Sequence, residues 1–325
     1  MARNQNILAI RLKSIGDVVL TLPAVSVLRE NFPTTKISFL TSAENASLLR
    51  GFREVDETIT LDRAALRGGH PLRMTGELFR LLCRLRSGRF SLVVDLQGNG
   101  ESAWLTRITG AAQRWGAIYH GKHRWAFTHT VERLRHIHAA EIHLELLRQG
   151  GLKTGKIRNE FILPAEAMEA GRRFFEKQNL TSKKPVMFIQ PFTSSPQKNW
   201  PLQYYLELAA HWRARGWQVL FSGGPADRAA LEPAHTAGFV ISAGVPLLVT
   251  ARLMQLSTLI VGGDTGALHL AVAQGKRVVM LMNHNRSGRP HPFRHPEWSL
   301  LPSVDLNIAT IRLDSVIGAC EAALG

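Results

Sequence analysis

Residues 262–269, with the sequence GGDTGALH, combine a glycine turn, an acid and the start of a helix directly after the apolar run 257–261. Three glycines let backbone amides approach a ligand closely, and the first turn of a helix directs unpaired N–H groups to the same point. The segment therefore predicts an anion site in which Asp264 faces sugar hydroxyls, as a phosphorylated sugar would require. The alternative is an ordinary strand-to-helix connection in which Asp264 or Thr265 caps the helix.

A second candidate site is the segment 190–201, QPFTSSPQKNWP, which also follows an apolar run. The hydroxyls of Thr193, Ser194 and Ser195 and the ammonium of Lys198 lie within six residues, a composition that fits a phosphate clamp. Lys198 could neutralise charge that develops on a diphosphate leaving group. The alternative is a polar loop whose Trp200 and Pro201 begin the next helix.

Two further acids follow glycine turns at the ends of apolar runs. Asp17, in the segment 13–23 (KSIGDVVLTLP), is placed where α/β enzymes hold catalytic groups, and it could accept a proton from a sugar hydroxyl. Asp227, in the segment 221–228 (FSGGPADR), could bind the ribose hydroxyls of a nucleotide. Either acid could instead cap a helix or lie in its first turn.

Other signatures of catalysis are weak or missing. The chain has no Asp-x-Asp pair for a metal-bridged nucleotide and no Walker A run, and residues 98–103 (GNGESA) lack the acid that a dinucleotide site needs about 20 residues later. The densest histidine group, His136, His138 and His143 with Glu141, does not have the spacing of a metal site, so no metal is expected. A second group, in the Arg-rich loop 283–295, predicts polar contacts with a ligand or with an opposite domain.

Short apolar runs alternate with helical patterns along the whole chain, which predicts parallel sheets with crossover helices. A polar, glycine-rich stretch at 150–156 divides the chain into predicted domains 1–160 and 161–325. Each would be a doubly wound α/β domain, with ligands gathered in a cleft at the carboxyl ends of the strands. The predicted strands are 7–12, 37–41, 58–61, 92–96, 186–189, 219–222, 259–261 and 278–282.

One predicted helix is both basic and amphipathic. Its leucines at 78, 81, 82 and 85 follow helical spacing, and arginines at 73, 80, 84, 86 and 89 supply the polar side. It is either a crossover helix with its leucine stripe on a sheet and its arginines in water, or a contact for anionic lipid or saccharide.

Charge and composition restrict the partners. The 325 residues carry a formal net charge of +15, and residues 1–160 hold 24 Lys and Arg against 14 Asp and Glu, whereas residues 161–325 hold 16 against 11. An anionic partner is expected, but no nucleic-acid-binding motif is present, so nucleic acid is not predicted. No apolar run reaches the roughly 20 residues of a membrane span, no signal peptide is evident, and two cysteines indicate a reducing compartment.

Taken together, the motifs resemble those of the ADP-heptose:lipopolysaccharide heptosyltransferases, glycosyltransferase family nine, which have the GT-B fold. The resemblance covers nearly the whole chain, and the order and spacing of its motifs are specific. They are residues 14–17 (SIGD) followed by Leu22 and Pro23, residues 95–98 (DLQG), residues 198–201 (KNWP), and residues 263–266 (GDTG) with His269.

The resemblance implies an inverting, metal-independent transfer of heptose from ADP-heptose, without a further cofactor. Asp17 would be the general base on the acceptor hydroxyl, Thr193, Ser194 and Lys198 would hold phosphate, and Asp264 would bind heptose hydroxyls. The implied donor-binding set is completed by Asp227, Gly263, Thr265, Gly266 and His269. The implied acceptor-binding set is Lys13, Ser14, Gly16 and Gln97.

The implied acceptor is the inner core of lipopolysaccharide, at a Kdo or a heptose residue. The enzyme would then be a monomer, peripheral on the cytoplasmic face of the inner membrane of a Gram-negative bacterium. The final helix, at about 308–324, would pack back across the domain boundary. Two alternatives remain open: another GT-B reaction, either transfer of a different nucleotide-linked sugar or epimerisation, and a non-catalytic protein that binds anionic glycolipid.

Overall fold

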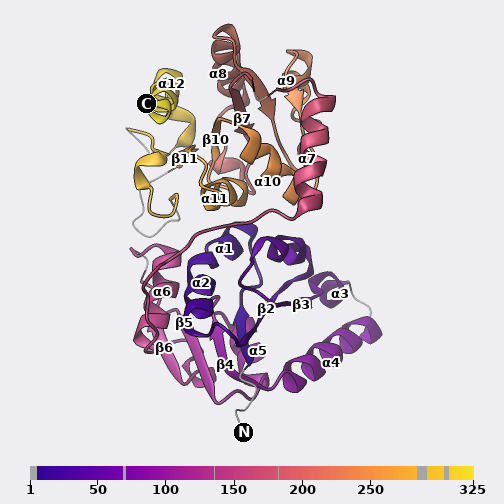
Figure 1. Cartoon of the computed structure of the whole chain (residues 1–325), viewed down its shortest axis with the longest axis vertical. Coiled ribbons are helices and arrows are strands. Elements are labelled where there is room, and N and C mark those ends of the chain that lie inside the picture. Colours follow the sequence, from indigo (N-terminus) through magenta and orange to yellow (C-terminus); the bar gives the residue numbers. More distant parts are fainter. Residues whose placement is uncertain (1–5, 69–70, 135, 182, 284–290, 304–306) are drawn as a thin grey trace. The chain divides into compact units, whose positions relative to one another are not determined.

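The computed structural model describes all residues except 1–5, 69–70, 135, 182, 284–290 and 304–306 (Figure 1). Most of the His- and Arg-rich loop identified above therefore lies outside the described residues. The chain divides into two compact units, Met1–Phe161 and Ile162–Gly325. Each unit is built around one six-stranded sheet. No described helix has both the length and the apolar character that crossing a membrane requires.

The sheet of the first unit is parallel and has the order β3-β2-β1-β4-β5-β6. The apolar runs predict the four strands on the β3 side of the sheet, but they miss β5 and β6. Those two strands, QRWGAI and HTVE, mix polar with apolar residues, and β6 is an edge strand. The strands are β1 (Asn6–Ile10), β2 (Lys36–Ser42), β3 (Glu57–Leu61), β4 (Phe90–Asp95), β5 (Gln113–Ile118) and β6 (His129–Glu132).

Helices connect these strands. Helix α2 packs beside α6, whereas α4 contacts α3 and α5. The helices are α1 (Ile15–Val19), α2 (Leu22–Asn31), α3 (Arg63–Arg67), α4 (Pro71–Ser87), α5 (Gly100–Ile108) and α6 (Ala139–Gln149), with 3-10 turns at η1 (Ala43–Gly51) and η2 (Arg124–Ala126).

The predicted leucine stripe on α4 is only half correct. Leu81 and Leu85 enter the core against residues of β1, β2 and β3, but Leu78 and Leu82 are 48% and 40% exposed. Fewer apolar side chains of α4 therefore pack on the sheet than the apolar pattern predicts, and the others face solvent.

The sheet of the second unit is also parallel, in the order β12-β11-β10-β7-β8-β9. The sequence predicts the four longer strands and misses β9 and β12, which have two residues each. The strands are β7 (Val186–Gln190), β8 (Gln218–Phe221), β9 (Val240–Ile241), β10 (Leu259–Gly263), β11 (Val278–Leu281) and β12 (Ser299–Leu300).

Helix α8 packs beside α12, and α10 contacts both α7 and α11. The helices of this unit are α7 (Ala165–Lys177), α8 (Leu202–Ala214), α9 (Glu232–Thr236), α10 (Leu247–Leu256), α11 (Gly266–Ala273) and α12 (Leu313–Leu324), with 3-10 turns at η3 (Pro196–Lys198), η4 (Pro225–Asp227), η5 (Pro296–Trp298) and η6 (Ile308–Thr310).

The final helix begins five residues later than predicted. Asn307 accepts a hydrogen bond from the amide of Ala309, which caps η6, and Ile311 and Arg312 are extended before α12 starts. The described contacts of α12 include α8, β10 and β11 of its own unit. Its passage across the domain boundary stays a prediction.

Both sheets have the same topology, and this places the candidate residues. In each unit the first strand, β1 or β7, is central in the sheet. The next two strands lie successively on one side of it, and the last three lie successively on the other side. The strand order reverses between β1 and β4 in the first sheet and between β7 and β10 in the second. The loops after these strands border the crevice where doubly wound sheets bind ligands. All four motif segments are these loops.

Candidate functional site

The catalytic candidate of the first unit, Asp17, forms an ion pair with Arg11. Arg11 Nη2 lies 2.7 Å from Asp17 Oδ1, with side-chain exposures of 7% for Arg11 and 37% for Asp17. Asp17 also accepts hydrogen bonds at Oδ2 from the amide of Ser14 (2.9 Å) and from its hydroxyl (3.2 Å). Asp17 is the third residue of α1, and its hydrogen bond from the Ser14 amide is the first-turn contact that the helix-capping alternative predicts. Both carboxylate oxygens are held by these contacts, and the side chain remains accessible to solvent.

These contacts keep Asp17 ionised. Burial raises the pKa of its carboxyl, but the charge of Arg11 and the hydrogen bonds from Ser14 and Arg11 outweigh burial, so the pKa lies below its usual range. An accessible carboxylate that is ionised at neutral pH can accept a proton from a hydroxyl that becomes acidic as it attacks.

Arg11 is anchored by a carbonyl at the end of β4. Its Nη1 donates to the Leu96 carbonyl at 2.6 Å, and its Nε donates to the Lys13 carbonyl at 3.1 Å. Arg133 donates to the same Leu96 oxygen at 2.6 Å, and its Nη2 lies 2.7 Å from His143 Nε2. Two buried guanidinium groups thus meet at one carbonyl, which fixes the cation that holds Asp17.

His143 belongs to this network. Burial and the charges of Arg133 and Arg11 lower its pKa well below the usual value, so the ring is neutral beside the carbonyls of Leu20 and Leu96. In the part of the chain that the structure describes, no three His, Cys, Asp or Glu side chains are grouped to bind a metal ion.

The DLQG segment ties the loop after β4 to the loop after β1. Gln97 Oε1 accepts from the Leu12 amide at 2.8 Å, and the buried Asp95 accepts from the amides of Gln97 and Gly98. Gly98 has φ 71°, and a Cβ there would lie 1.7 Å from the Ala117 carbonyl oxygen, so only glycine fits. Gln97 Nε2 is buried without a partner among the described residues. The acceptor-binding role of Gln97 stays a prediction, and its oxygen is already used to position the loop.

The other predicted acceptor residues surround Asp17. Lys13 and Ser14 are exposed, and Gly16 is buried in the first turn of α1. The sequence reasoning missed Arg11, Arg133 and His143 as residues that position the carboxylate. Only Arg11 carries a signal, since it is a cation at the end of an apolar strand.

Replacing Arg11 with Gln tests this positioning. Without the guanidinium, burial is opposed only by Ser14, so the pKa of Asp17 should rise. We expect the acid limb of the pH–kcat profile to move to higher pH while the KM for the donor is unchanged. Arg11→Lys should retain much of the wild-type profile, because it keeps the charge. If Arg11→Gln lowers kcat equally at every pH, Arg11 does not set the ionisation of Asp17.

In the second unit, Lys198, Asp264 and His269 meet at the ends of β7 and β10. Lys198 Nζ lies 2.8 Å from Asp264 Oδ2, and His269 Nε2 lies 3.4 Å from Oδ1. The Asp264 side chain is 10% exposed and that of Lys198 is 30% exposed. Burial raises the pKa of Asp264, but His269 and Lys198 lower it to about 2. The sequence predicts Lys198 for phosphate and Asp264 for sugar; the structure brings the two side chains together as a pair.

The start of α11 is open to an anion. Thr265 is the N-cap, and its hydroxyl accepts from the Leu268 amide, so of the two candidate caps it is Thr265 that performs the role. Asp264 is thereby left for other partners. The amides of Gly266 and Ala267 have no acceptor in the described chain, as expected for the first turn of a helix.

Two glycines let the β10 turn lie directly against the β7 loop. A Cβ on Gly263 would be 2.6 Å from Thr193 Cγ2, and one on Gly262 would be 2.4 Å from the Gln190 carbonyl oxygen. Any larger residue would push the two loops apart, and with them Lys198 and Asp264. The glycines of this motif therefore serve close packing as well as ligand approach.

The loop that carries Lys198 is held from inside the protein. Trp200 is 1% exposed, and its Nε1 donates to the Ile311 carbonyl at 2.9 Å. Asn199 Oδ1 accepts from the Thr193 amide, and the Thr193 hydroxyl donates to the Ser195 carbonyl at 2.8 Å. The Thr193 hydroxyl is thus engaged within the loop, whereas Ser194 is exposed and has no partner among the described residues. Their phosphate-binding roles stay predictions.

Asp227 lies in the turn η4, which follows β8, and β8 is the neighbour of β7 in the sheet. Its Oδ2 accepts from the Gly224 amide at 2.7 Å, which is the first-turn contact that the alternative interpretation predicts. Oδ1 is not used in that contact. Binding of ribose by Asp227 stays a prediction.

Comparisons with known proteins identify the family of the chain. The sequence model of glycosyltransferase family 9 (heptosyltransferase) matches residues 78–298. Lipopolysaccharide heptosyltransferase 1 of Pseudomonas aeruginosa is 26% identical over 286 residues, which cover 82% of this chain and 75% of that protein.

Solved structures show the same fold over almost the whole chain. A family 9 glycosyl transferase from Veillonella parvula superposes with a TM-score of 0.86 at 20% identity, covering 98% of this chain and 97% of that one. E. coli heptosyltransferase WaaC with ADP gives a TM-score of 0.80 at 18% identity, covering 98% and 100%. The fold is GT-B, and the chain belongs to glycosyltransferase family 9, the heptosyltransferase family.

Proposed function

We propose that this protein transfers a heptose from ADP-heptose to a hydroxyl of the lipopolysaccharide inner core, with inversion at the anomeric carbon and without a metal ion. The observation that carries the proposal is the Asp17 carboxylate, which Arg11 holds ionised and half accessible at the crevice of the first sheet. Family membership and the names of the relatives, which include lipopolysaccharide heptosyltransferases 1, 2 and 3, support it.

In the proposed reaction Asp17 accepts the proton of the acceptor hydroxyl. The hydroxyl oxygen bonds to the anomeric carbon on the face opposite the diphosphate, the bond from that carbon to the phosphate oxygen breaks, and ADP leaves with the electron pair. Lys198 and the amides at Thr265 and Gly266 stabilise the charge on the diphosphate. Asp264 contacts heptose hydroxyls from its position beside Lys198, with His269 behind it.

The remaining donor residues complete this proposal. Ser194 and Thr193 lie in the Lys198 loop and would contact phosphate, Gly263 admits the donor to the turn, and Asp227 would accept hydrogen bonds from ribose. Lys13, Ser14, Gly16 and Gln97 would line the acceptor side.

The charge of the chain supports the proposed acceptor class. The first 160 residues carry most of the excess of Lys and Arg, and the inner core is rich in carboxylate and phosphate. We therefore propose a peripheral monomer at the cytoplasmic face of the inner membrane of a Gram-negative bacterium, where that core is assembled. Nucleic acid is not part of the proposal.

A transfer assay tests the proposal. Purified protein is given ADP-heptose with a Kdo-terminated or a heptose-terminated core acceptor, with and without EDTA, and ADP release and product mass are measured. We expect heptosylated product with one of the acceptors and full activity in EDTA. Epimerised donor formed without acceptor would support the epimerase alternative, and a strict need for metal or for a UDP-sugar would contradict the proposal.

A further inference from the structure

Helix α4 (Pro71–Ser87) exposes an unusual amount of apolar surface. Five of the thirteen large apolar side chains that are exposed in the described residues belong to this one helix. Leu72 is 89% exposed and Phe79 is 68% exposed, more than a crossover helix with a wet polar face would show. The other three are Met74, Leu78 and Leu82.

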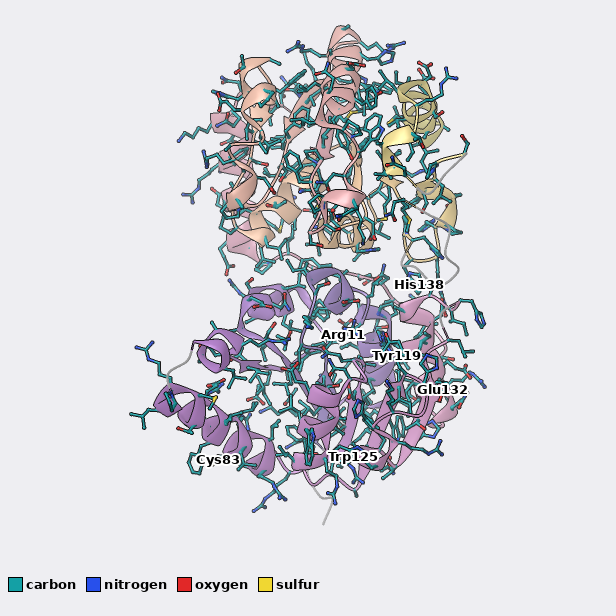
Figure 2. The ribbon with its side chains drawn as sticks, turned by 180° about the vertical axis from the view of Figure 1, so that it is seen from behind. Arg11, Cys83, Tyr119, Trp125, Glu132 and His138 are labelled. Atoms are coloured by element: carbon teal, nitrogen blue, oxygen red, sulfur yellow. The ribbon has the colours of Figure 1, made fainter. Side chains whose placement is uncertain are left out.

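The exposed side chains face away from the core of their own unit. At 100° per residue, Leu72 and Phe79 point about opposite to Leu81, which with Leu85 is buried under the helix. Both views of the ribbon show α4 on the outer side of the first unit, with Cys83 marked on it in Figure 2. The outward side of α4 is therefore an apolar ridge that no described part of its own unit covers.

The charge around this ridge is positive. Glu77 is the only acid on α4, and it forms an ion pair with Arg80, with 2.7 Å between Glu77 Oε1 and Arg80 Nη2. Arg84 pairs with Glu57 of β3. Two more arginines of α4, Arg73 and Arg86, and Arg89 just after the helix are exposed and have no carboxylate partner among the described residues.

We propose that α4 docks on the surface of an anionic lipid bilayer. The ridge of Leu72, Phe79 and Leu82 would enter the boundary between headgroups and acyl chains, while Arg73 and Arg86 contact lipid phosphates. A helix with apolar side chains on its outward face and unpaired cations beside them has the composition of an interfacial helix. A saccharide ligand would use the arginines but would leave Leu72 and Phe79 without a role. This assignment does not depend on the reaction proposed above.

The two cysteines allow this surface to be probed directly. Cys83 is exposed on α4, whereas Cys320 is buried and burial raises the pKa of its thiol to about 12. A thiol-reactive, environment-sensitive fluorophore should therefore label Cys83 alone. We expect its emission to shift to the blue, and to be protected from an aqueous quencher, when vesicles of phosphatidylcholine with phosphatidylglycerol are added, but not with phosphatidylcholine alone. Unchanged emission with both vesicles would overturn the proposal.

Variants separate the apolar from the ionic contribution. In flotation with the anionic vesicles, Leu72→Ser/Phe79→Ser and Arg73→Gln/Arg86→Gln should each reduce the bound fraction by roughly tenfold. The control, Met168→Ser/Leu324→Ser, removes two apolar side chains of the second unit that are 41% and 40% exposed, and it should bind as the wild type does. Added salt should weaken binding of the wild type.

Flotation of the variants can also contradict the proposal. Wild-type flotation by the two α4 variants would overturn it, and so would equal loss in the control. If the α4 variants instead abolish a dimer detected by light scattering, the ridge is a contact between copies of the chain. Thermal unfolding of each variant should match the wild type, since all substituted side chains are exposed. Because flotation needs no substrate, its result is independent of whether ADP-heptose is the donor.

Discussion

Asp17→Asn should reduce kcat for heptosyl transfer by about a hundredfold to ten-thousandfold, the contribution of a positioned general base. The amide has the shape of the carboxylate, and its oxygen can still accept the hydrogen bond that the Ser14 amide donates to Asp17. What it cannot do is accept a proton from the attacking hydroxyl. Donor binding, measured by calorimetry with ADP, should be unchanged, because no predicted donor residue is altered.

A matched control is available in the same unit. Asp62 caps α3 by accepting from the Ala65 amide at 2.9 Å, so like Asp17 it accepts a backbone amide at the start of a helix, but it has no proposed role in the chemistry. Asp62→Asn should lower stability slightly and leave kcat near the wild-type value. Full transfer activity in Asp17→Asn would show that another group takes the proton, and equal losses in both variants would reduce the role of Asp17 to helix capping.

The Asp17 ion pair also has a defined effect on stability. A carboxyl whose pKa is lower in the folded than in the unfolded chain stabilises the fold above the unfolded pKa, and this contribution is lost as pH falls through the lowered folded pKa. The contribution of Asp17 is therefore complete at neutral pH.

Local sequence patterns were sufficient to predict most of the sheet. An apolar run, a turn and a helix follow one another within about 20 residues, so strands β1 to β4 and the four longer strands of the second unit could be found from the sequence alone. The missed strands either mix polar residues into the run, as β5 does, or are too short to show a period, as β9 is. Pairing with a neighbouring strand, which no local window contains, makes these segments strands.

For the candidate site, too, the sequence predicts some features and misses others. The loops were predictable because glycine, proline and acidic residues after a strand are a local signal. Contacts between the loops were not, since Arg11 reaches Leu96 across 85 positions and Lys198 reaches Asp264 across 66. The sequence therefore predicts phosphate as the partner of Lys198, whereas its partner in the structure is a carboxylate.

Several motif residues hold loops in place. Trp200 is buried against Ile311, and Gln97 accepts from Leu12. Neither side chain needs to touch substrate for its identity to matter, because each fixes a loop that carries a candidate catalytic residue. A substitution at Trp200 should act on Lys198 through the backbone.

The second large effect is expected for Lys198→Ala. Loss of one preorganised donor to a developing anion commonly costs about a hundredfold to a thousandfold in kcat, and Lys198 pairs with Asp264, which directly precedes the N-cap of α11. The variant should also bind ADP more weakly in calorimetry. Lys198→Arg keeps the charge and should retain part of the activity, and Lys177→Ala, a lysine on α7, serves as the control.

The pairing with Asp264 offers a competing explanation that a double variant resolves. Lys198→Ala leaves the Asp264 carboxylate, 10% exposed, with His269 as its remaining partner, so the pKa of Asp264 should rise from about 2. If Lys198 serves only to neutralise Asp264, then Lys198→Ala/Asp264→Asn should recover the activity of Asp264→Asn. If Lys198 stabilises the departing diphosphate, the double variant should be slower than Asp264→Asn by nearly the full Lys198→Ala factor. Recovery in the double variant would remove Lys198 from the chemical step, because its ammonium would then be needed only by its own neighbour.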